Sequence, residues 1–155
     1  MNKEISIIIP TYQRSRQLDQ ILKSLCSQLI PENKVEVIIC DSFSKDGSEE
    51  LIKKKYVNNK KVNLKYININ ENVLSAKRNI GIRNSSFNYL ILIDDDCIPD
   101  KDFIKNYCLD FDVSDKKTIL SGVVKYPIDN IKKINYLKFR SNTHFQENNI
   151  HPNSE

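Results

Sequence analysis

The sequence predicts an α/β fold, a mostly parallel open sheet with helices on both faces, and three observations support this expectation. Short apolar runs of the kind found in strands buried on both faces recur along the chain, as in ISIII and LILI. Between them lie segments whose apolar residues follow the three-four spacing of a helix. The strands and helices alternate, and such alternation is typical of parallel strands joined by right-handed crossovers.

In the first half of the chain, each element has a local reason. Residues 5–9 form an apolar strand that Pro10 stops. The next helix begins near Ser15 or Arg16, because apolar side chains then recur at helical spacing: Leu18, Ile21, Leu22, Leu25, Cys26 and Leu29. A second strand covers 35–40 and ends at an acid. The second helix runs from about residue 46 toward 56, since Asp46 and Glu49 have capping-box spacing.

In the second half, the strand predicted over 64–69 has a mixed pattern, which indicates a place near a sheet edge. A helix follows over 73–83, although Gly81 weakens it. The apolar run 89–93 predicts a strand buried on both faces. A helix over 103–111 and a last strand over 119–124 complete the pattern.

Composition limits the classes of protein that the chain can represent. Its 155 residues are enough for one domain with a real core. The net charge of +4 is spread along the chain and gives no support for nucleic-acid binding. No apolar segment approaches the ~20 residues that span a bilayer, so a cytoplasmic location is expected. The four cysteines lack CxxC spacing and are expected to be buried thiols.

The stretch LILIDDDCIPD places three carboxylates directly after the strand over 89–93. Three adjacent carboxylates repel one another, so a cation is expected nearby. Taken alone, this stretch has two interpretations, a solvated turn and a metal site. In an open parallel sheet, however, ligands bind beyond the carboxyl ends of the strands. The polar segments at the strand ends should therefore meet at one rim: PTYQR, Asp41, the three acids and the Lys77–Arg78 pair. Such a rim suits Mg²⁺ or Mn²⁺ together with a phosphorylated ligand.

Four segments carry a family resemblance. They resemble, in this order, the motifs of family 2 inverting glycosyltransferases with the GT-A fold: ISIIIPTYQR, VEVIICDSFSKDGSEE, LSAKRNIGI and LILIDDDCIPD. The resemblance covers roughly the first 125 residues and corresponds to the N-terminal half of such an enzyme, which binds the nucleotide sugar. It implies a core domain over 1–125 and an incomplete acceptor-side extension over 126–155 with a partly disordered tail.

The resemblance also implies roles for particular residues. Thr11 and Tyr12 would line the nucleoside pocket with Arg14 beside them, and Asp41 would accept a hydrogen bond from a uracil imide. Ser42 follows Asp41 where many relatives have a second acid.

At the phosphates, Arg78 and Lys77 would sit near the nucleotide and its diphosphate. Asp96 would bind the metal, and Asp94 the metal or the ribose. Asp95 is expected to face away. The simpler alternatives are packing and turn roles for Thr11, Tyr12 and Asp41, and a solvated charge for Arg14 and Lys77.

The implied activity is transfer of a sugar from a nucleotide sugar, expected to be UDP-linked, to a glycan or lipid-linked hydroxyl with inversion, in cell-surface polysaccharide synthesis. The family's acidic catalytic base is not recognisable after LILIDDDCIPD, which resembles the family's DxD strand. Asp129 and Glu147 lie beyond it, but the residues around them do not match the family's motif. We therefore expect the chain to bind its donor but to turn over poorly alone. The run YLKFR could touch a lipid-linked acceptor or the inner face of the plasma membrane, although packing under the sheet is the simpler interpretation.

Three alternatives differ in their sequence signals. A nucleotidyltransferase typically needs a glycine-rich loop after the first strand, where PTYQRSRQ has no glycine. A receiver-type phosphoacceptor needs an acidic pair at the position of Pro10 and Thr11. The third alternative is a truncated module that binds a nucleotide sugar without catalysis and depends on a partner, and the missing base supports it.

Overall fold

The computed structural model describes residues 3–28, 34–57, 63–114 and 118–125. Its sheet contains four strands in the order β3-β2-β1-β4: β1 is Glu4–Thr11, β2 Lys34–Asp41, β3 Asn63–Asn68 and β4 Tyr89–Leu92. Every neighbouring pair is parallel, as the alternating pattern predicts. The mixed strand β3 lies at one edge, which confirms that expectation, and the mostly apolar strand β1 lies in the interior. The strand β4 lies at the other edge of these four strands and its Leu92 is 48% exposed, so the expectation that this apolar run is buried on both faces is wrong.

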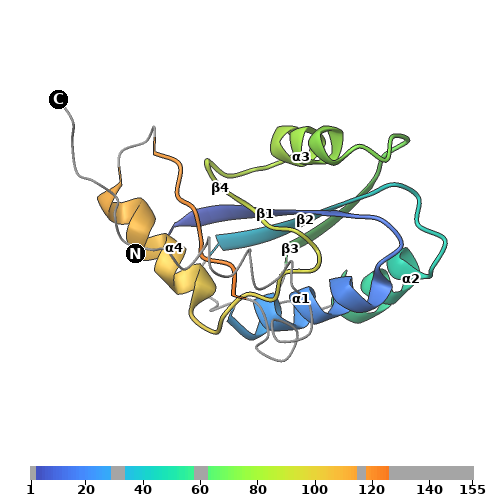
Figure 1. Cartoon of the computed structure of the whole chain (residues 1–155), viewed down its shortest axis with the longest axis horizontal. Coiled ribbons are helices and arrows are strands. Elements are labelled where there is room, and N and C mark those ends of the chain that lie inside the picture. The colour runs from blue at the N-terminus through green and yellow to red at the C-terminus, as the bar shows by residue number, and fades with distance from the viewer. Residues whose placement is uncertain (1–2, 29–33, 58–62, 115–117, 126–155) are drawn as a thin grey trace, which may run out of the picture. The chain divides into compact units, whose positions relative to one another are not determined.

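Helices cover both faces of this sheet, as predicted. They are α1 (Ser15–Gln28), α2 (Ser48–Ile52), which continues as the single-turn π-helix η1 (Lys53–Val57), α3 (Leu74–Arg83) and α4 (Phe103–Val113). Figure 1 shows α3 on one side of the sheet and α1 and α2 on the other. The predicted capping box at α2 is wrong in detail, because Gly47 with φ 77° stands at the N-cap position and Asp46 accepts a hydrogen bond from the Ser48 N–H instead.

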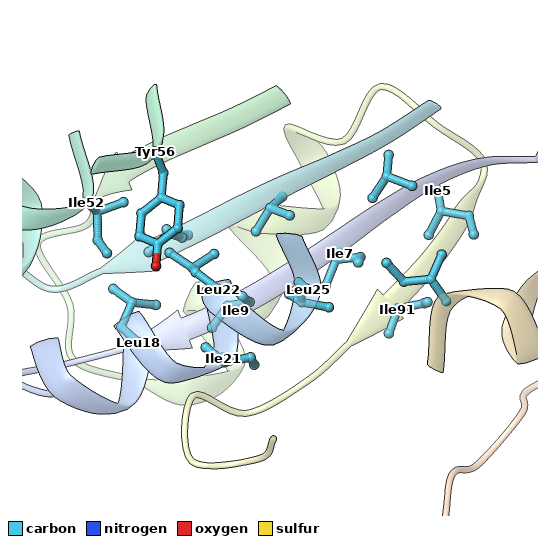
Figure 2. Packing of buried hydrophobic residues seen from close by; sticks show 14 residues of the cluster. Ile5, Ile7, Ile9, Leu18, Ile21, Leu22, Leu25, Ile52, Tyr56 and Ile91 are labelled. Atoms are coloured by element: carbon cyan, nitrogen blue, oxygen red, sulfur yellow. The ribbon is translucent and has the colours of Figure 1, made fainter. Parts of the chain in front are cut away.

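The main core lies between the sheet and α1. Alternate residues of β1 point to this side, and the α1 side chains at helical spacing meet them, as Figure 2 shows for Ile7, Ile9 and Leu22. These residues are fully buried, together with Ile5, Leu18, Ile21 and Leu25. Burying each aliphatic side chain contributes on the order of 1.5–3 kcal/mol, so this face supplies most of the hydrophobic stabilisation.

On the opposite face, α3 packs closely against the centre of the sheet because it carries a glycine there. A Cβ added at Gly81 would lie 2.4 Å from Ile8 Cγ2 and 3.2 Å from Cys40 Sγ. The glycine that weakens the helix pattern in the sequence therefore has a packing reason. It lets the helix that bears Lys77 and Arg78 approach β1 and β2.

We predict that Gly81→Ala lowers the free energy of unfolding by about 1–3 kcal/mol, the usual cost of overpacking a core. Ile8 is buried and β-branched, so its methyl group cannot turn aside easily. Denaturant titration measures the change, and Ile82→Ala at the exposed neighbouring position is the matched control. A Gly81→Ala protein as stable as the wild type would contradict the close approach of α3.

A buried carboxylate joins α3 to the sheet at the opposite end from the acids. Glu36 on β2 is fully buried and accepts hydrogen bonds from Ser6 Oγ (2.6 Å) and from the N–H and hydroxyl of Ser86, in the turn after α3. Lys65 Nζ lies 2.8 Å from Glu36 Oε2. Burial of Glu36 opposes its ionisation, but the hydrogen bonds from Lys65, Ser6 and Ser86 outweigh this effect and hold its pKa below the ordinary value.

Because the pKa of Glu36 is lowered in the folded protein, its stabilisation is present above the unfolded value of about 4.3 and is lost as the pH falls through the folded value. We expect Glu36→Gln to cost about 1–3 kcal/mol at pH 7 and progressively less in acid. Urea unfolding from pH 7 to pH 3 checks this, with Glu50→Gln as an exposed control of equal charge. A cost for Glu36→Gln that did not change with pH would show that Glu36 is not held as a carboxylate.

The predicted strand over 119–124 is wrong. The chain separates into two compact units, 1–116 and 117–155, and the described part of the second, 118–125, has no regular secondary structure. Ile119 is 94% exposed and Val123 58%, so its apolar residues lack the neighbouring strand that would bury them. Within the described ranges, no helix has both the length and the apolar character needed to cross a membrane.

Candidate functional site

The carboxyl ends of the parallel strands meet at one rim, where most of the residues singled out in the sequence come together. Thr11 and Asp41 are register partners at the ends of β1 and β2. Leu92 of β4 pairs with Ile8 of β1, so the three acids begin two residues beyond the last paired position. The N-terminal half of α3 brings Lys77 and Arg78 to the same rim.

The middle acid lies at the centre of this rim, which corrects the expectation that Asp95 faces away. Asp95 is 6% exposed and accepts hydrogen bonds from Thr11 Oγ1 at 2.7 Å and from Arg14 Nη1 at 3.0 Å. Burial raises the pKa of Asp95, while Thr11 and Arg14 act in the opposite direction. A signal for this was present, because Asp95 continues the period-two series of inward residues from Ile91 and Ile93.

Two arginines provide the cations that three adjacent carboxylates require. Arg14 Nη1 also donates to Asp96 Oδ2 at 2.9 Å, so one guanidinium bridges two acids. Arg78 Nη2 donates to Asp94 Oδ1 at 2.7 Å. Both pairs are partly exposed, and their contribution to stability is therefore on the order of 1 kcal/mol or less. Their role is to balance charge at a place where a ligand has access.

Lys77 behaves differently from the two arginines. It is 4% exposed, and its Nζ donates to the backbone oxygen of Thr11 and to Asn72 Oδ1, both at 2.7 Å. The same atom lies 5.5 Å from the centre of the Tyr12 ring. Burial lowers the pKa of Lys77, and the nearby charges of Asp41 and Asp95 act against this shift.

Asp41 is fully buried, and protein donors surround its carboxylate. Oδ1 accepts from the Ser42 N–H at 2.8 Å and from Ser44 Oγ at 2.5 Å. Oδ2 accepts from the Ser44 N–H at 2.8 Å and from Tyr66 Oη at 2.9 Å. A carboxylate accepts about four hydrogen bonds in all, so Asp41 organises the loop after β2 with its full capacity.

The loops after β1 and β2 each contain a non-glycine residue in the left-handed region, Gln13 with φ 51° and Phe43 with φ 53°. Such conformations cost free energy and persist where neighbouring contacts fix them. Here the Gln13 N–H donates to Ser44 Oγ at 2.6 Å and ties the two loops together. Tyr12 and Phe43 are 39% and 54% exposed on these loops, where their rings are available to a ligand.

A separate hollow of about 530 Å³ runs along α3 and the end of β3. Ile67, Ile80, Asn79 and Arg83 are among its lining residues, and none of the eight residues expected to bind nucleotide or metal lines it. The paired acids and arginines lie instead on the rim.

The rim offers oxygen donors for a hard divalent cation. Asp94 and Asp96 have side chains that are 47% and 57% exposed at the strand end. Among the described residues, no group of three or more His, Cys, Asp or Glu side chains could hold a metal. One or two carboxylates can bind Mg²⁺ or Mn²⁺ when substrate phosphates and water supply the other ligands.

Comparison with known proteins decides the family. The model of glycosyl transferase family 2 matches residues 6–154, nearly the whole chain. The chain belongs to this family. Chondroitin synthase of Escherichia coli is 34% identical over 88% of the chain, and glycosyltransferase AglE of Haloferax volcanii is 32% identical over 65%. The chain spans only 19% and 33% of the lengths of these two relatives.

Solved structures agree with this family membership. The crystal structure of S. aureus TarS 1-349 in complex with UDP-GlcNAc superimposes with a TM-score of 0.63 at 27% identity, over 70% of this chain and 31% of that one. The mannosyltransferase PcManGT from Pyrobaculum calidifontis, in complex with GDP-Man and Mn²⁺, shares the fold with a TM-score of 0.63 at 21% identity, over 70% of this chain and 32% of that one. The predicted GT-A fold, an open α/β sheet of the Rossmann type, is thus confirmed.

We predict that Thr11→Val lowers the free energy of unfolding by about 1–3 kcal/mol, because it removes the donor to Oδ2 of the buried Asp95 carboxylate and leaves only Arg14, which donates to Oδ1. Thr11→Ser keeps the hydroxyl and should retain most of the stability. Denaturant unfolding of the three proteins at pH 7 measures the difference. A larger loss for Ser than for Val would indicate that the methyl group of Thr11, rather than its hydroxyl, matters.

Proposed function

We propose that this chain binds a nucleoside-diphosphate sugar, with UDP as the carrier, and supplies the donor side of a glycosyl transfer in polysaccharide synthesis. The observation that carries the proposal is the charge pattern of the rim, where three carboxylates lie beside two partly exposed arginines. Such an arrangement suits a diphosphate and a divalent cation together. The cation can pair with the carboxylates, and the diphosphate can pair with the arginines.

Arg14 and Arg78 are the cations available to the diphosphate. Their side chains are 45% and 34% exposed, and each contacts a carboxylate that a metal ion could take over. Arg78 Nε is buried and has no hydrogen-bond partner among the described residues, which leaves one donor of this guanidinium unused. An arginine released from Asp94 or Asp96 can pair with phosphate oxygens, which it binds well through parallel donors.

The exposed carboxylates of Asp94 and Asp96 fit the divalent cation, Mn²⁺ or Mg²⁺, that the family implies. Asp96 would hold the metal, and Asp94 would hold the metal or the ribose. When bound, the cation acts as a Lewis acid that offsets the charge developing on the leaving diphosphate. The ion pairs of Arg14 and Arg78 keep the acids in place when no ligand is there to do so.

The nucleoside would lie over the ends of β1 and β2. Tyr12, which is exposed, would offer its ring for stacking, and the buried Thr11 would lie beneath the nucleoside. Asp41 can accept the imide N–H of uracil only if that donor replaces or shares one of the four present, since the carboxylate is already saturated. The Ser44 hydroxyl, which can rotate, is the donor most easily replaced.

The acceptor side is assigned by the family alone. An acceptor hydroxyl would attack the anomeric carbon with inversion, and a general base would take its proton, typically for about 10²- to 10⁴-fold in rate. Asp129 and Glu147, the acids considered for this role, lie outside the described residues. The acceptor, a glycan or lipid-linked hydroxyl, and a cytoplasmic location at the membrane face belong to the same proposal.

A second candidate is a module that binds the nucleotide sugar without turning it over and needs a partner chain. The observation that favours it is that no acidic base with the family's context is recognisable after LILIDDDCIPD. A radioactive UDP-sugar assay with the purified chain, alone and with added partner, separates the two. Sustained transfer by the chain alone supports an autonomous enzyme.

Calorimetry with UDP, GDP and dTDP, each with and without Mn²⁺, tests the proposed site. We expect UDP to bind best and Mn²⁺ to strengthen its binding. In the Asp94→Ala/Asp96→Ala double variant, adding Mn²⁺ should no longer change the affinity, because the carboxylates that hold the ion are gone. Asp100→Ala removes an exposed acid nearby and serves as the control. Metal-dependent binding that survived the double substitution would refute this site.

A further inference from the structure

We propose that Lys77 is a positioning residue that fixes the nucleoside-contacting end of β1, and is not a ligand of the diphosphate. This inference rests on the proposed function, and it differs from the role that the family resemblance implies for Lys77. The evidence for it is the set of contacts that the buried ammonium group of Lys77 makes within the protein.

The donors of Lys77 are already committed within the protein. An ammonium group has three N–H donors. One contacts the backbone oxygen of Thr11 and one contacts Asn72 Oδ1, both at 2.7 Å. The Tyr12 ring centre lies 5.5 Å from Nζ, within the range of a cation–π contact. With a side chain only 4% exposed, little of this group can reach a phosphate.

The contrast with Arg14 and Arg78 supports this assignment. Both arginines are at least a third exposed and pair with exposed carboxylates, so a ligand can displace them. Lys77 instead contacts a main-chain carbonyl and a side-chain amide. If Lys77 moved toward a diphosphate, the carbonyl of Thr11 would lose this donor, and an unpaired buried carbonyl costs free energy. A surface arginine can leave its exposed carboxylate without this cost.

Through these contacts Lys77 joins three segments at the rim. Thr11 ends β1, Asn72 belongs to the loop between β3 and α3, and Lys77 itself belongs to α3. The carbonyl that it holds belongs to the residue whose hydroxyl donates to Asp95. Gln13, in the left-handed region, follows two residues later, so the lysine fixes the chain just before its strained turn.

Comparing uridine with UDP separates the two roles, since only UDP has a diphosphate. For Lys77→Met, which keeps the length and removes the ammonium, we expect both ligands to bind roughly 5- to 30-fold more weakly, by the same factor, in the absence of metal. NMR titration measures both affinities on folded protein. The amide resonances of Tyr12 and Gln13 should also shift in the ligand-free variant.

Two further variants keep the test decisive. Asn72→Ala removes one acceptor of Lys77 from an exposed residue and should weaken uridine and UDP equally, by less than Lys77→Met does. Lys65→Met is the matched control, because Lys65 Nζ likewise donates to a backbone oxygen, that of Asn84, and to the Ser86 hydroxyl, at the opposite end of the sheet. It should lower thermal stability and leave both affinities unchanged.

A loss for UDP with no loss for uridine would overturn the inference and make Lys77 a phosphate ligand. A lower melting temperature with both affinities and the amide resonances unchanged would overturn it in favour of a purely structural role. If the wild-type chain binds neither ligand, the proposed function fails, and the nucleoside role of Lys77 fails with it. The amide shifts of Tyr12 and Gln13 then still decide whether Lys77 holds this loop.

Discussion

Electrostatic repulsion among three consecutive carboxylates constrains everything at the rim of this sheet. Asp95 can be buried only because β1 supplies a hydroxyl from Thr11 and the residues after it supply the guanidinium of Arg14. Asp94 depends in the same way on Arg78 of α3. The acids thus draw β1, β4 and α3 together, and the parallel pairing of β1 with β4 makes this geometry possible.

The scaffold below this rim was readable from the sequence because its elements are locally consistent. The apolar run ISIII predicts the interior strand β1, whereas LILI forms the strand β4 at an edge, so an apolar run predicts a strand but not its burial on both faces. The spacing of Leu18, Ile21, Leu22 and Leu25 predicts α1, because the helix has one buried face. The motif order predicted that Thr11, Asp41, Arg78 and Asp94 meet at one rim. The binding roles that we propose for them rest on the family resemblance rather than on this pattern.

Other features depend on tertiary contacts that no local pattern reveals. The burial of Asp95 depends on Thr11 and Arg14, which belong to a segment far away in the sequence. The donors that saturate Asp41 come from a loop and, in Tyr66, from a different strand. The run 119–124 has the composition of a strand, but composition cannot supply the neighbour that a strand needs. Gly81 weakened the helix in sequence, and only the distance to Ile8 explains it.

The hydroxyl of Ser44 has a double role, since it accepts from the Gln13 N–H and donates to Asp41. The position of the loop after β1 and that of the carboxylate at the end of β2 therefore depend on the same hydroxyl group. Substitutions in the two loops share this link, so their energetic effects are not expected to add. A substitution that remodels one loop would therefore require an accommodating change in the other, and the two loops would have to change together.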